Sequence, residues 1–462
     1  MRGTIINFAY LLASILFIFG LQGLSHPRTA VRGNLTGALG MLVALMATMA
    51  DKRVLSFELI LTGVIVGSAI GGLLATRIRM TAMPQMVALL NGFGGGASVL
   101  VAATALIERQ VVTVAPVRQM LLATVASGII GTLTFCGSLV AFAKLQGLMT
   151  ERSLLFSGQR WVNALVGAAT LMLGGWFLAH PFSADTFWFV VAAAALLGIM
   201  LTIPIGGADM PVVISLLNSY SGLAAAATGF VLANNVLIIA GSLVGASGII
   251  LTKIMCSAMN RSLFAVLSGF VAVRDGQRKE EAGIYAGRVK SAVAEEIAPL
   301  LEIARRVVIV PGYGMAVSQA QHSAAELAKL LEAKGRDVVF AIHPVAGRMP
   351  GQMNVLLAEA GVSYDKLKDM DEINPMFPTT DVVIVVGAND VVNPLARTDK
   401  LSPIAGMPIL DVDKSRTVVV IKRSLSPGFA GIPNPLFAAS NTLMLFGDAN
   451  KMLLDLIHAL KQ

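Results

Sequence analysis

The chain has little charge for its length. Of its 462 residues, 13% are Asp, Glu, Lys or Arg, whereas soluble domains carry about 25%. It also has few aromatic residues (6%), five histidines and two cysteines. Cys136 and Cys256 lie in apolar runs, without CxxC spacing or a neighbouring histidine. We therefore expect them to be small packing residues, and we predict neither a disulfide nor a metal site.

Acidic residues are scarcest in the first part of the chain. Residues 1–273 hold 14 Lys/Arg and 6 Asp/Glu, whereas residues 274–462 hold 21 of each. The positive excess thus belongs to the apolar part, as expected for basic cytoplasmic loops of a membrane protein. We find no Lys/Arg cluster with interleaved aromatic residues, so nucleic-acid binding is not predicted.

Long apolar runs fill the first part of the chain, and the mean hydropathy of the whole is +0.75. A helix that spans a bilayer needs about 20 apolar residues. Nine windows meet this condition: 4–24, 34–50, 54–76, 83–107, 117–143, 160–180, 184–203, 208–231 and 234–256. Glycine and alanine are dense inside them, which favours close helix packing in lipid. We interpret the first window as a retained helix, because no AxA-like cleavage site follows it.

The loops between these windows differ in charge. Those after the first, third and fifth windows are the more basic, with Arg28, Arg32, Arg77, Arg79, Lys144, Arg152 and Arg160. Basic loops face the cytoplasm. We therefore predict a periplasmic N-terminus, membrane lipid around the helices and a cytoplasmic C-terminal part.

The pattern changes after the ninth window. Residues 257–300 are predicted to be a linker, because 274–300 are charged, contain glycines and lack apolar periodicity until Val293. From 301 onward, short apolar runs follow at α/β spacing: VVIVPG (307), DVVFAIHP (337), DVVIVVGAND (381), MPILDV (407), TVVVIKRS (417) and TLMLFGD (442). Such runs indicate strands buried on both faces of a parallel sheet. We thus predict a membrane domain (1–256), the linker, and a doubly wound α/β Rossmann-like domain (301–462).

The first of these runs ends in a candidate dinucleotide-binding turn. Gly312-Tyr-Gly314-Met-Ala-Val317 follows a predicted strand and opens a helix. In such a fingerprint the first glycine makes the tight turn and the second lets the backbone approach a pyrophosphate. The third position is Val317 instead of Gly or Ala, and an ordinary glycine turn is the alternative. The strand–turn–helix–strand context favours the nucleotide interpretation.

The strand ends favour NADP(H) over NAD(H). NAD-binding units place an acidic residue at the end of the second strand, but here that strand ends in Ile342-His343-Pro344, with Arg348 soon after. The run at 417 ends in Lys422-Arg423-Ser424. Two cations and a hydroxyl suit a phosphate monoester. A solvated surface pair is the alternative.

Longer strings resemble the beta subunit of proton-translocating NAD(P) transhydrogenase over essentially the whole chain. They are GGADMPVVISLLNSYSG (206–222), GYGMAVSQAQ (312–321), HPVAGRMPGQMNVLLAEA (343–360), MDEIN (370–374), GANDVVNP (387–394), SPIAGMP (402–408), KRS (422–424) and GDA (447–449). The resemblance implies that NADP(H) is surrounded by Gly312, Tyr313, Gly314, Met315, Ala316, Val317, Val345, Ala346, Gly347, Arg348, Met349, Pro350, Gly387, Ala388, Asn389, Asp390, Val391, Gly406, Met407, Lys422, Arg423, Ser424, Leu425, Ser426, Pro427, Gly428, Phe429, Gly447 and Asp448. Phe429 departs from the tyrosine expected in the family, which removes one hydroxyl.

Few polar residues lie within the apolar windows, where a proton path needs them. The candidates are Asn91, Ser138, Asp209, Asn218 and Ser247. Taken alone, the asparagines suit hydrogen bonding between helices, and Asp209 suits a helix N-cap. The resemblance implies that Asn91 and Asn218 lie along a proton channel, with Asp209 at its junction with the nucleotide domain. Some members carry histidine in place of Asn91, so we predict that the titrating histidine lies on a partner subunit. His26 and His180 fall in predicted loops.

The resemblance implies an enzyme of the AB-specific (Si-Re) class in a bacterial inner membrane, which couples hydride transfer between NAD(H) and NADP(H) to proton translocation. Because this chain shows one fingerprint only, the NAD(H) site is expected on another chain. The resemblance implies that the other chain is an alpha subunit and that the complex is a dimer of alpha–beta units. No residue is assigned as a general acid or base. An ion transporter with a regulatory NADP-sensing domain is an alternative. So is a quinone-linked oxidoreductase, which would need a flavin.

Overall fold

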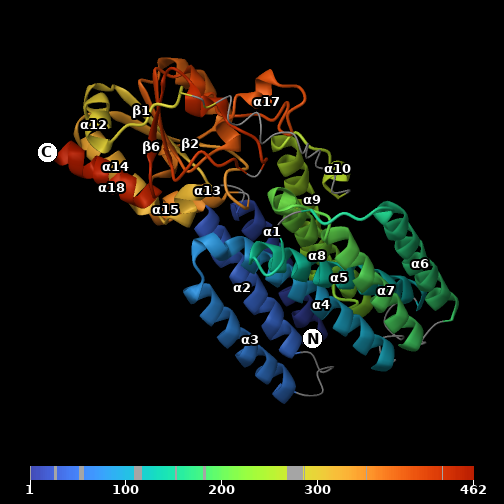
Figure 1. Cartoon of the computed structure of the whole chain (residues 1–462). Helices are drawn as coiled ribbons and strands as arrows, with labels where there is room; N and C mark the ends of the chain where they lie inside the picture. Colours follow the sequence, from blue (N-terminus) through green and yellow to red (C-terminus); the bar gives the residue numbers. More distant parts are fainter. Residues whose placement is uncertain are drawn as a thin grey trace. The chain divides into compact units, whose positions relative to one another are not determined.

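The computed structural model describes residues 2–24, 29–50, 57–108, 117–150, 153–180, 184–267, 285, 287–349, 351–428 and 430–462. The chain divides into two compact units. The first comprises residues 1–206 and 212–252, and the second comprises residues 207–211 and 253–462. Each unit is described separately below (Figure 1).

Helices that are long and apolar enough to cross a membrane dominate the first unit, and the described residues contain nine of them. They are α1 (Arg2–Leu24), α2 (Ala30–Met49), α3 (Phe57–Arg77), α4 (Met83–Glu108), α5 (Val117–Leu145), α6 (Gln159–Ala179), α7 (Ala184–Thr202), α8 (Met210–Leu232) and α9 (Asn235–Ala258). The nine-helix prediction is therefore confirmed. The predicted second window (34–50) began too late, because α2 starts at Ala30.

Glycines bring the backbones of these helices close together. A Cβ added to Gly95 of α4 would lie 2.5 Å from the Gly131 carbonyl oxygen of α5. A Cβ on Gly222 of α8 would lie 2.4 Å from the Gly245 nitrogen of α9. In lipid, where apolarity alone does not drive helix association, such close packing stabilises a bundle. Helix α8 is the most enclosed of the nine, with 72% of its apolar window buried.

A six-stranded parallel sheet forms the core of the second unit. The strands are β1 (Arg306–Pro311), β2 (Asp337–Ile342), β3 (Leu367–Asp369), β4 (Val382–Val386), β5 (Thr417–Lys422) and β6 (Thr442–Phe446). Their order is β3-β2-β1-β4-β5-β6, and each adjacent pair is parallel. This is the order of a doubly wound Rossmann fold, which confirms the predicted fold class.

Two strand predictions were wrong. The MPILDV run at 407 forms no strand; it is mostly buried chain in which Leu410 N–H donates to the Val391 carbonyl. The third strand of the sheet is instead β3, whose three residues Leu-Lys-Asp carry no apolar run. A short edge strand needs little apolar surface, so it leaves little signal in the sequence.

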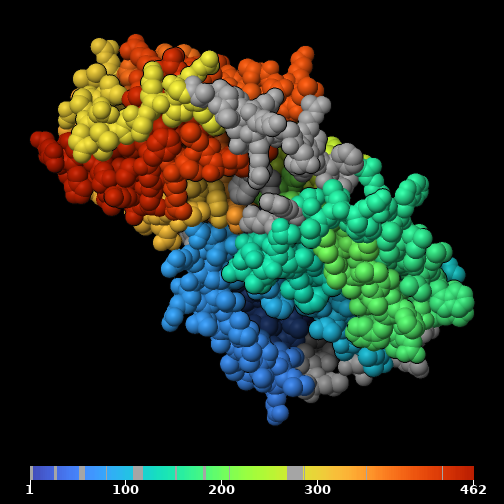
Figure 2. Space-filling view, in the orientation of Figure 1, coloured from blue at the N-terminus to red at the C-terminus, as the bar shows by residue number. Residues whose placement is uncertain are grey.

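Different elements cover the two faces of the sheet. Helices α12 (Ala294–Ile303), α14 (Gln321–Ala333) and α18 (Ala449–Lys461) pack together on one face. Figure 2 shows α18 (red) beside α12 (yellow) on the domain surface. The remaining helices of this unit are α10 (Leu263–Leu267), α13 (Tyr313–Val317), α15 (Gln352–Glu359), α16 (Met370–Ile373) and α17 (Leu395–Thr398).

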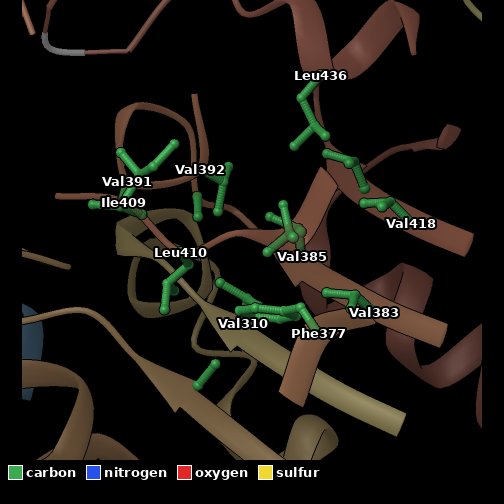
Figure 3. Close-up of a cluster of buried hydrophobic side chains, with 14 of the residues drawn as sticks. Val310, Phe377, Val383, Val385, Val391, Val392, Ile409, Leu410, Val418 and Leu436 are labelled. Carbon is green, nitrogen blue, oxygen red and sulfur yellow. The ribbon is translucent and has the colours of Figure 1, made fainter. Parts of the chain in front are cut away.

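The other face bears an apolar cluster that short turns and loops cover. Val310, Val383 and Val385 of the strands pack against Phe377 and Leu410 (Figure 3). All five are fully buried. Successive side chains of a strand point to opposite faces of the sheet, and here both faces are covered. This explains why the strands are continuous β-branched runs and do not alternate with polar residues.

Candidate functional site

The candidate site lies where the strand order reverses, at the carboxyl ends of β1 and β4. Open parallel sheets place ligands at such a switch point. A pocket there is lined by loops that follow five of the six strands. The predicted residues that line it are Gly312, Tyr313, Gly314, Val317, Val345, Ala346, Gly347, Arg348, Gly387, Ala388, Asn389, Asp390, Val391, Met407, Lys422, Arg423, Ser424, Ser426, Pro427, Gly428 and Gly447.

Other predicted residues lie apart from the pocket wall. Met315 and Ala316 are fully buried beneath it. Met349, Gly406, Leu425 and Asp448 do not line it, and Pro350 and Phe429 lie outside the described residues. Sequence reasoning did not assign the lining residues Pro403, Ile404, Ile421, Ala430 and Ala449, whose apolar side chains offer no polar group to a ligand.

Two glycine loops form the base of the site by direct backbone contact. Gly312 N–H donates to the Val386 carbonyl, and Gly314 N–H donates to the Gly387 carbonyl, each at 2.9 Å. A Cβ on Gly312 would lie 2.4 Å from the Cα of Ala388, so no side chain fits there. Gly312 itself is extended (φ −128°). The glycine is therefore required by this close approach, and not by a positive φ in a tight turn.

Arg348 lies beside Tyr313, and both residues line the pocket. The guanidinium carbon lies 4.6 Å from the centre of the tyrosine ring, which is a cation–π contact. The backbone N–H of Arg348 donates to Oε1 of the buried Gln352 at 2.7 Å. Gly347 allows this arrangement through its positive φ of 108°. Gln352 therefore shapes the loop, a role that the sequence analysis did not assign.

His343 connects two loops next to the pocket. Its Nε2 donates to the Pro408 carbonyl at 2.8 Å, and its Nδ1 accepts from the Val345 N–H at 3.2 Å. Burial lowers the pKa of His343 to about 4, although the bond to Pro408 opposes this shift. The ring is therefore neutral at pH 7, as this pairing requires. The sequence analysis noted His343 only because no acid occupies its position.

The end of β5 supplies two cations to the pocket. Lys422 donates to the Ser426 carbonyl and lies 5.1 Å from the centre of the Phe437 ring. Burial lowers the pKa of Lys422 to about 8, and the nearby Asp390 opposes this shift. Arg423 is more exposed and donates to Asp448 at 2.8 Å. That hydrogen bond lowers the pKa of Asp448.

Asn389 and Asp390 hold the loop after β4 against the loop after β5. With its amide oxygen facing the loop after β5, Asn389 accepts from Lys422 Nζ at 3.2 Å and from Gly428 N–H at 2.7 Å. Asp390 accepts from the Ala430 N–H at 3.0 Å. Among the described pocket residues of the sheet domain, Arg348, Lys422 and Arg423 outnumber the single acid, Asp390. This balance fits a ligand that carries several phosphate charges.

The predicted polar residues of the membrane helices fall into two groups. Asn91 of α4 is buried and donates to the Ile214 carbonyl of α8 at 3.4 Å. Ser138 of α5 is fully buried and packs against Gly92. Asn218 is half-buried on α8. Ser247 is exposed on α9 and donates within its own helix, so it does not join the others.

Further buried hydroxyls connect the same three helices. Ser127 of α5 donates to the Ser98 carbonyl of α4 at 3.0 Å, and its oxygen lies 2.9 Å from that of Thr228 of α8. The sequence analysis missed these residues, because isolated serines and threonines are common in apolar helices. His180 ends α6 and stacks on Trp176 at the surface. His26 lies outside the described residues.

Asp209 pairs with a cation. It closes a 3₁₀ turn (Gly207–Asp209) directly before α8 and is 1% exposed. Both carboxylate oxygens accept from Nη1 of Arg261, at 3.0 and 2.9 Å. Burial raises the pKa of Asp209, and the Arg261 guanidinium opposes this rise. The sequence analysis did not assign Arg261 to this pairing.

Together, these features define a class of protein: a membrane-embedded helical bundle that carries a Rossmann-like domain. A sequence model of the NAD(P) transhydrogenase beta subunit matches residues 6–459. Over 456 residues, 98% of each chain, the sequence is 48% identical to the NAD(P) transhydrogenase subunit beta of Rhodospirillum rubrum. A second curated protein from that species, with the same name, matches equally well. The chain therefore belongs to the NAD(P) transhydrogenase beta subunit family.

The contact between the glycine loops gives a test of the site's construction. Gly387 has a φ of +66°, and a Cβ there would lie 2.5 Å from the Cα of Gly314. We expect Gly387→Ala to lower the melting temperature of the full-length chain. The matched control is Gly335→Ala, because Gly335 has a φ of +80° but open space around it. The loss of stability in the control measures the backbone strain alone, which is about 1–2 kcal/mol. Equal melting temperatures for the two variants would contradict the close contact.

Proposed function

We propose that this chain is the NADP(H)-binding, proton-conducting subunit of a transhydrogenase. Its family establishes the transhydrogenase beta subunit, which implies an alpha subunit partner. The observation that carries the NADP(H) assignment is the cationic end of β5 at the switch-point pocket, together with the absence of an acid at the end of β2. We assign the NAD(H) site to the alpha subunit.

The candidate residues then bind and position the cofactor. The nicotinamide supplies the hydride chemistry when NADP(H) is bound. We assign Lys422 and Arg423 to the 2′-phosphate. We assign Arg348, which lines the same pocket as Gly312 and Gly314, to the pyrophosphate. Since both nicotinamides must meet in one geometry, the chain's contribution is orientation.

Proton movement through the helices is the proposed source of driving force. One proton that crosses 100 mV contributes about 2.3 kcal/mol, roughly a fifty-fold shift in an equilibrium. We propose that Asn91, Ser138 and Asn218 line the path with water. Asp209 and the linker would then carry the change to the loops at 343–351 and 387–394. Such coupling requires two states that differ in affinity for NADP(H).

The proposal also covers the organisation of the complex. We propose domain boundaries at 1–256, 257–300 and 301–462, although residues 268–284 and 286 of this linker lie outside the described residues. We also propose a bacterial inner-membrane location with a periplasmic N-terminus, AB-specific transfer that depends on the alpha subunit, and a dimer of alpha–beta units in lipid.

The phosphate assignment predicts a change in cofactor selectivity. We expect Arg423→Gln to weaken binding of NADP(H) about tenfold and to leave binding of NAD(H) unchanged, because the guanidinium would contact only the 2′-phosphate. Titration calorimetry on the purified chain would measure both affinities. Arg416→Gln is the control, since Arg416 precedes the opposite end of β5 and pairs with Asp381 at 2.9 Å. An equal loss for both cofactors would refute the assignment.

The lowered pKa of Lys422 predicts a pH dependence. Below about 8 the ammonium is charged, and above that pH the free site loses the charge. The 2′-phosphate stays dianionic above pH 7. NADP(H) affinity should therefore fall between pH 8 and 9, by up to about tenfold. In Lys422→Arg the guanidinium keeps its charge, so the decline should disappear. A decline that persists in this variant would assign the titration to another group.

Asp209 gives a test of the coupling route. Asp209→Asn keeps the shape of the side chain but removes the charge that faces Arg261. We expect the number of protons moved per hydride to fall about tenfold in vesicles that hold the complex. Asp185→Asn, at an exposed acid in the first turn of α7, is the control. An unchanged proton-to-hydride ratio would count against this route.

A further inference from the structure

A lysine is completely buried at the end of a membrane helix. Lys144 lies in the last turn of α5 and is 0% exposed. The sequence analysis had placed it in a loop, because its window ended at 143. Burying an ammonium at the edge of a bilayer is costly unless its donors are satisfied. The groups that Lys144 contacts therefore indicate its role.

The ammonium of Lys144 binds the chain that leaves α7. It donates to the carbonyl oxygens of Ile203 and Ile205, the latter at 2.7 Å. Helix α7 ends at Thr202, so these carbonyls lie at the negative end of its dipole. A cation at this position both satisfies the last carbonyls and interacts favourably with the dipole.

Two other side chains hold neighbouring carbonyls. Ser153 Oγ donates to the Pro204 carbonyl at 2.5 Å, and Gln159 Nε2 donates to the Met200 carbonyl at 3.2 Å. Three consecutive carbonyls, at residues 203 to 205, are therefore fixed by side chains from α5 and the segment after it. We call Lys144, Ser153 and Gln159 the carbonyl clamp.

The carbonyls of residues 203–205, which the clamp holds, lie just before Asp209 in the chain. Residues 206–208, Gly-Gly-Ala, are all that separate Ile205 from this acid. The four Cα–Cα steps from Ile205 to Asp209 span at most about 14 Å, so the position of Ile205 limits where Asp209 can lie. We propose that Lys144 is a positioning residue that sets the location of Asp209 and so controls the coupling of proton movement to hydride transfer. The inference rests on the proposed function.

The test uses the full complex with its alpha subunit in sealed vesicles. Three quantities are measured: hydride transfer, proton pumping, and the dissociation constant of NADP(H). We expect Lys144→Met to lower the protons pumped per hydride about tenfold, because charge-assisted bonds to two carbonyls are lost. NADP(H) affinity should change by less than about twofold, since the pocket is untouched.

Two variants provide matched comparisons. Lys144→Arg keeps the charge and the donors, and should restore the ratio to within about threefold of the wild type. Lys253→Met makes the same change at an exposed lysine near the end of α9, and should have no effect. If Lys144→Met does not accumulate in the membrane, Ser153→Ala decides, with an expected loss of about threefold.

Several results would overturn the inference. They are normal coupling in Lys144→Met, an Arg variant as defective as the Met variant, or a loss of NADP(H) affinity equal to the loss of pumping. Normal coupling in Ser153→Ala, when it is the deciding variant, would do the same. A wild-type complex that transfers hydride but pumps no protons would overturn the proposed function itself, and the inference with it.

Discussion

The backbone contact between the loops after β1 and β4 is the constraint on which the site depends. Gly314 and Gly387 approach so closely that neither can carry a side chain. Their hydrogen bond fixes the base of the switch-point pocket. The loops after β2 and β5 are then built around that base by Gln352, His343 and Asn389, which are largely buried or hydrogen-bonded to neighbouring backbone. The cations of the pocket consequently sit on a rigid frame.

A second constraint acts on the buried charges near the ends of the apolar helices, because a buried charge is costly unless it is paired. Lys144 meets it with carbonyls at the end of α7, and Asp209 meets it with Arg261. Asp209 ends the chain segment from Ile203 to Asp209, and Lys144 binds two carbonyls of the same segment. This segment, more than the interior of any single helix, is where a change in charge would alter the structure.

Sequence reasoning succeeded where burial imposes a pattern. Strands β1, β4 and β5 are buried on both faces, so their β-branched runs and their glycine turns are visible in the sequence. It failed where contacts are long-range. Nothing near residue 144 shows that the lysine contacts the end of α7. Nothing in MPILDV shows that this run bonds to the loop after β4 instead of to a strand. His343 acts through Pro408, which is distant in the chain, and Gln352 acts through Arg348 across a turn that no local motif encodes.

A small structural change would supply the free energy that the proposed coupling needs. In the proposed function, one proton that crosses 100 mV contributes about 2.3 kcal/mol, so two states that differ about fifty-fold in affinity for NADP(H) would be enough. The Arg348–Tyr313 contact lies in the range of about 0.5–2 kcal/mol, and one charge-assisted hydrogen bond contributes about 1.5–3 kcal/mol. In this proposal, loosening one or two such contacts in the loop at 343–351 would supply the whole difference. The sheet and its glycine base can stay fixed while the grip on the cofactor changes.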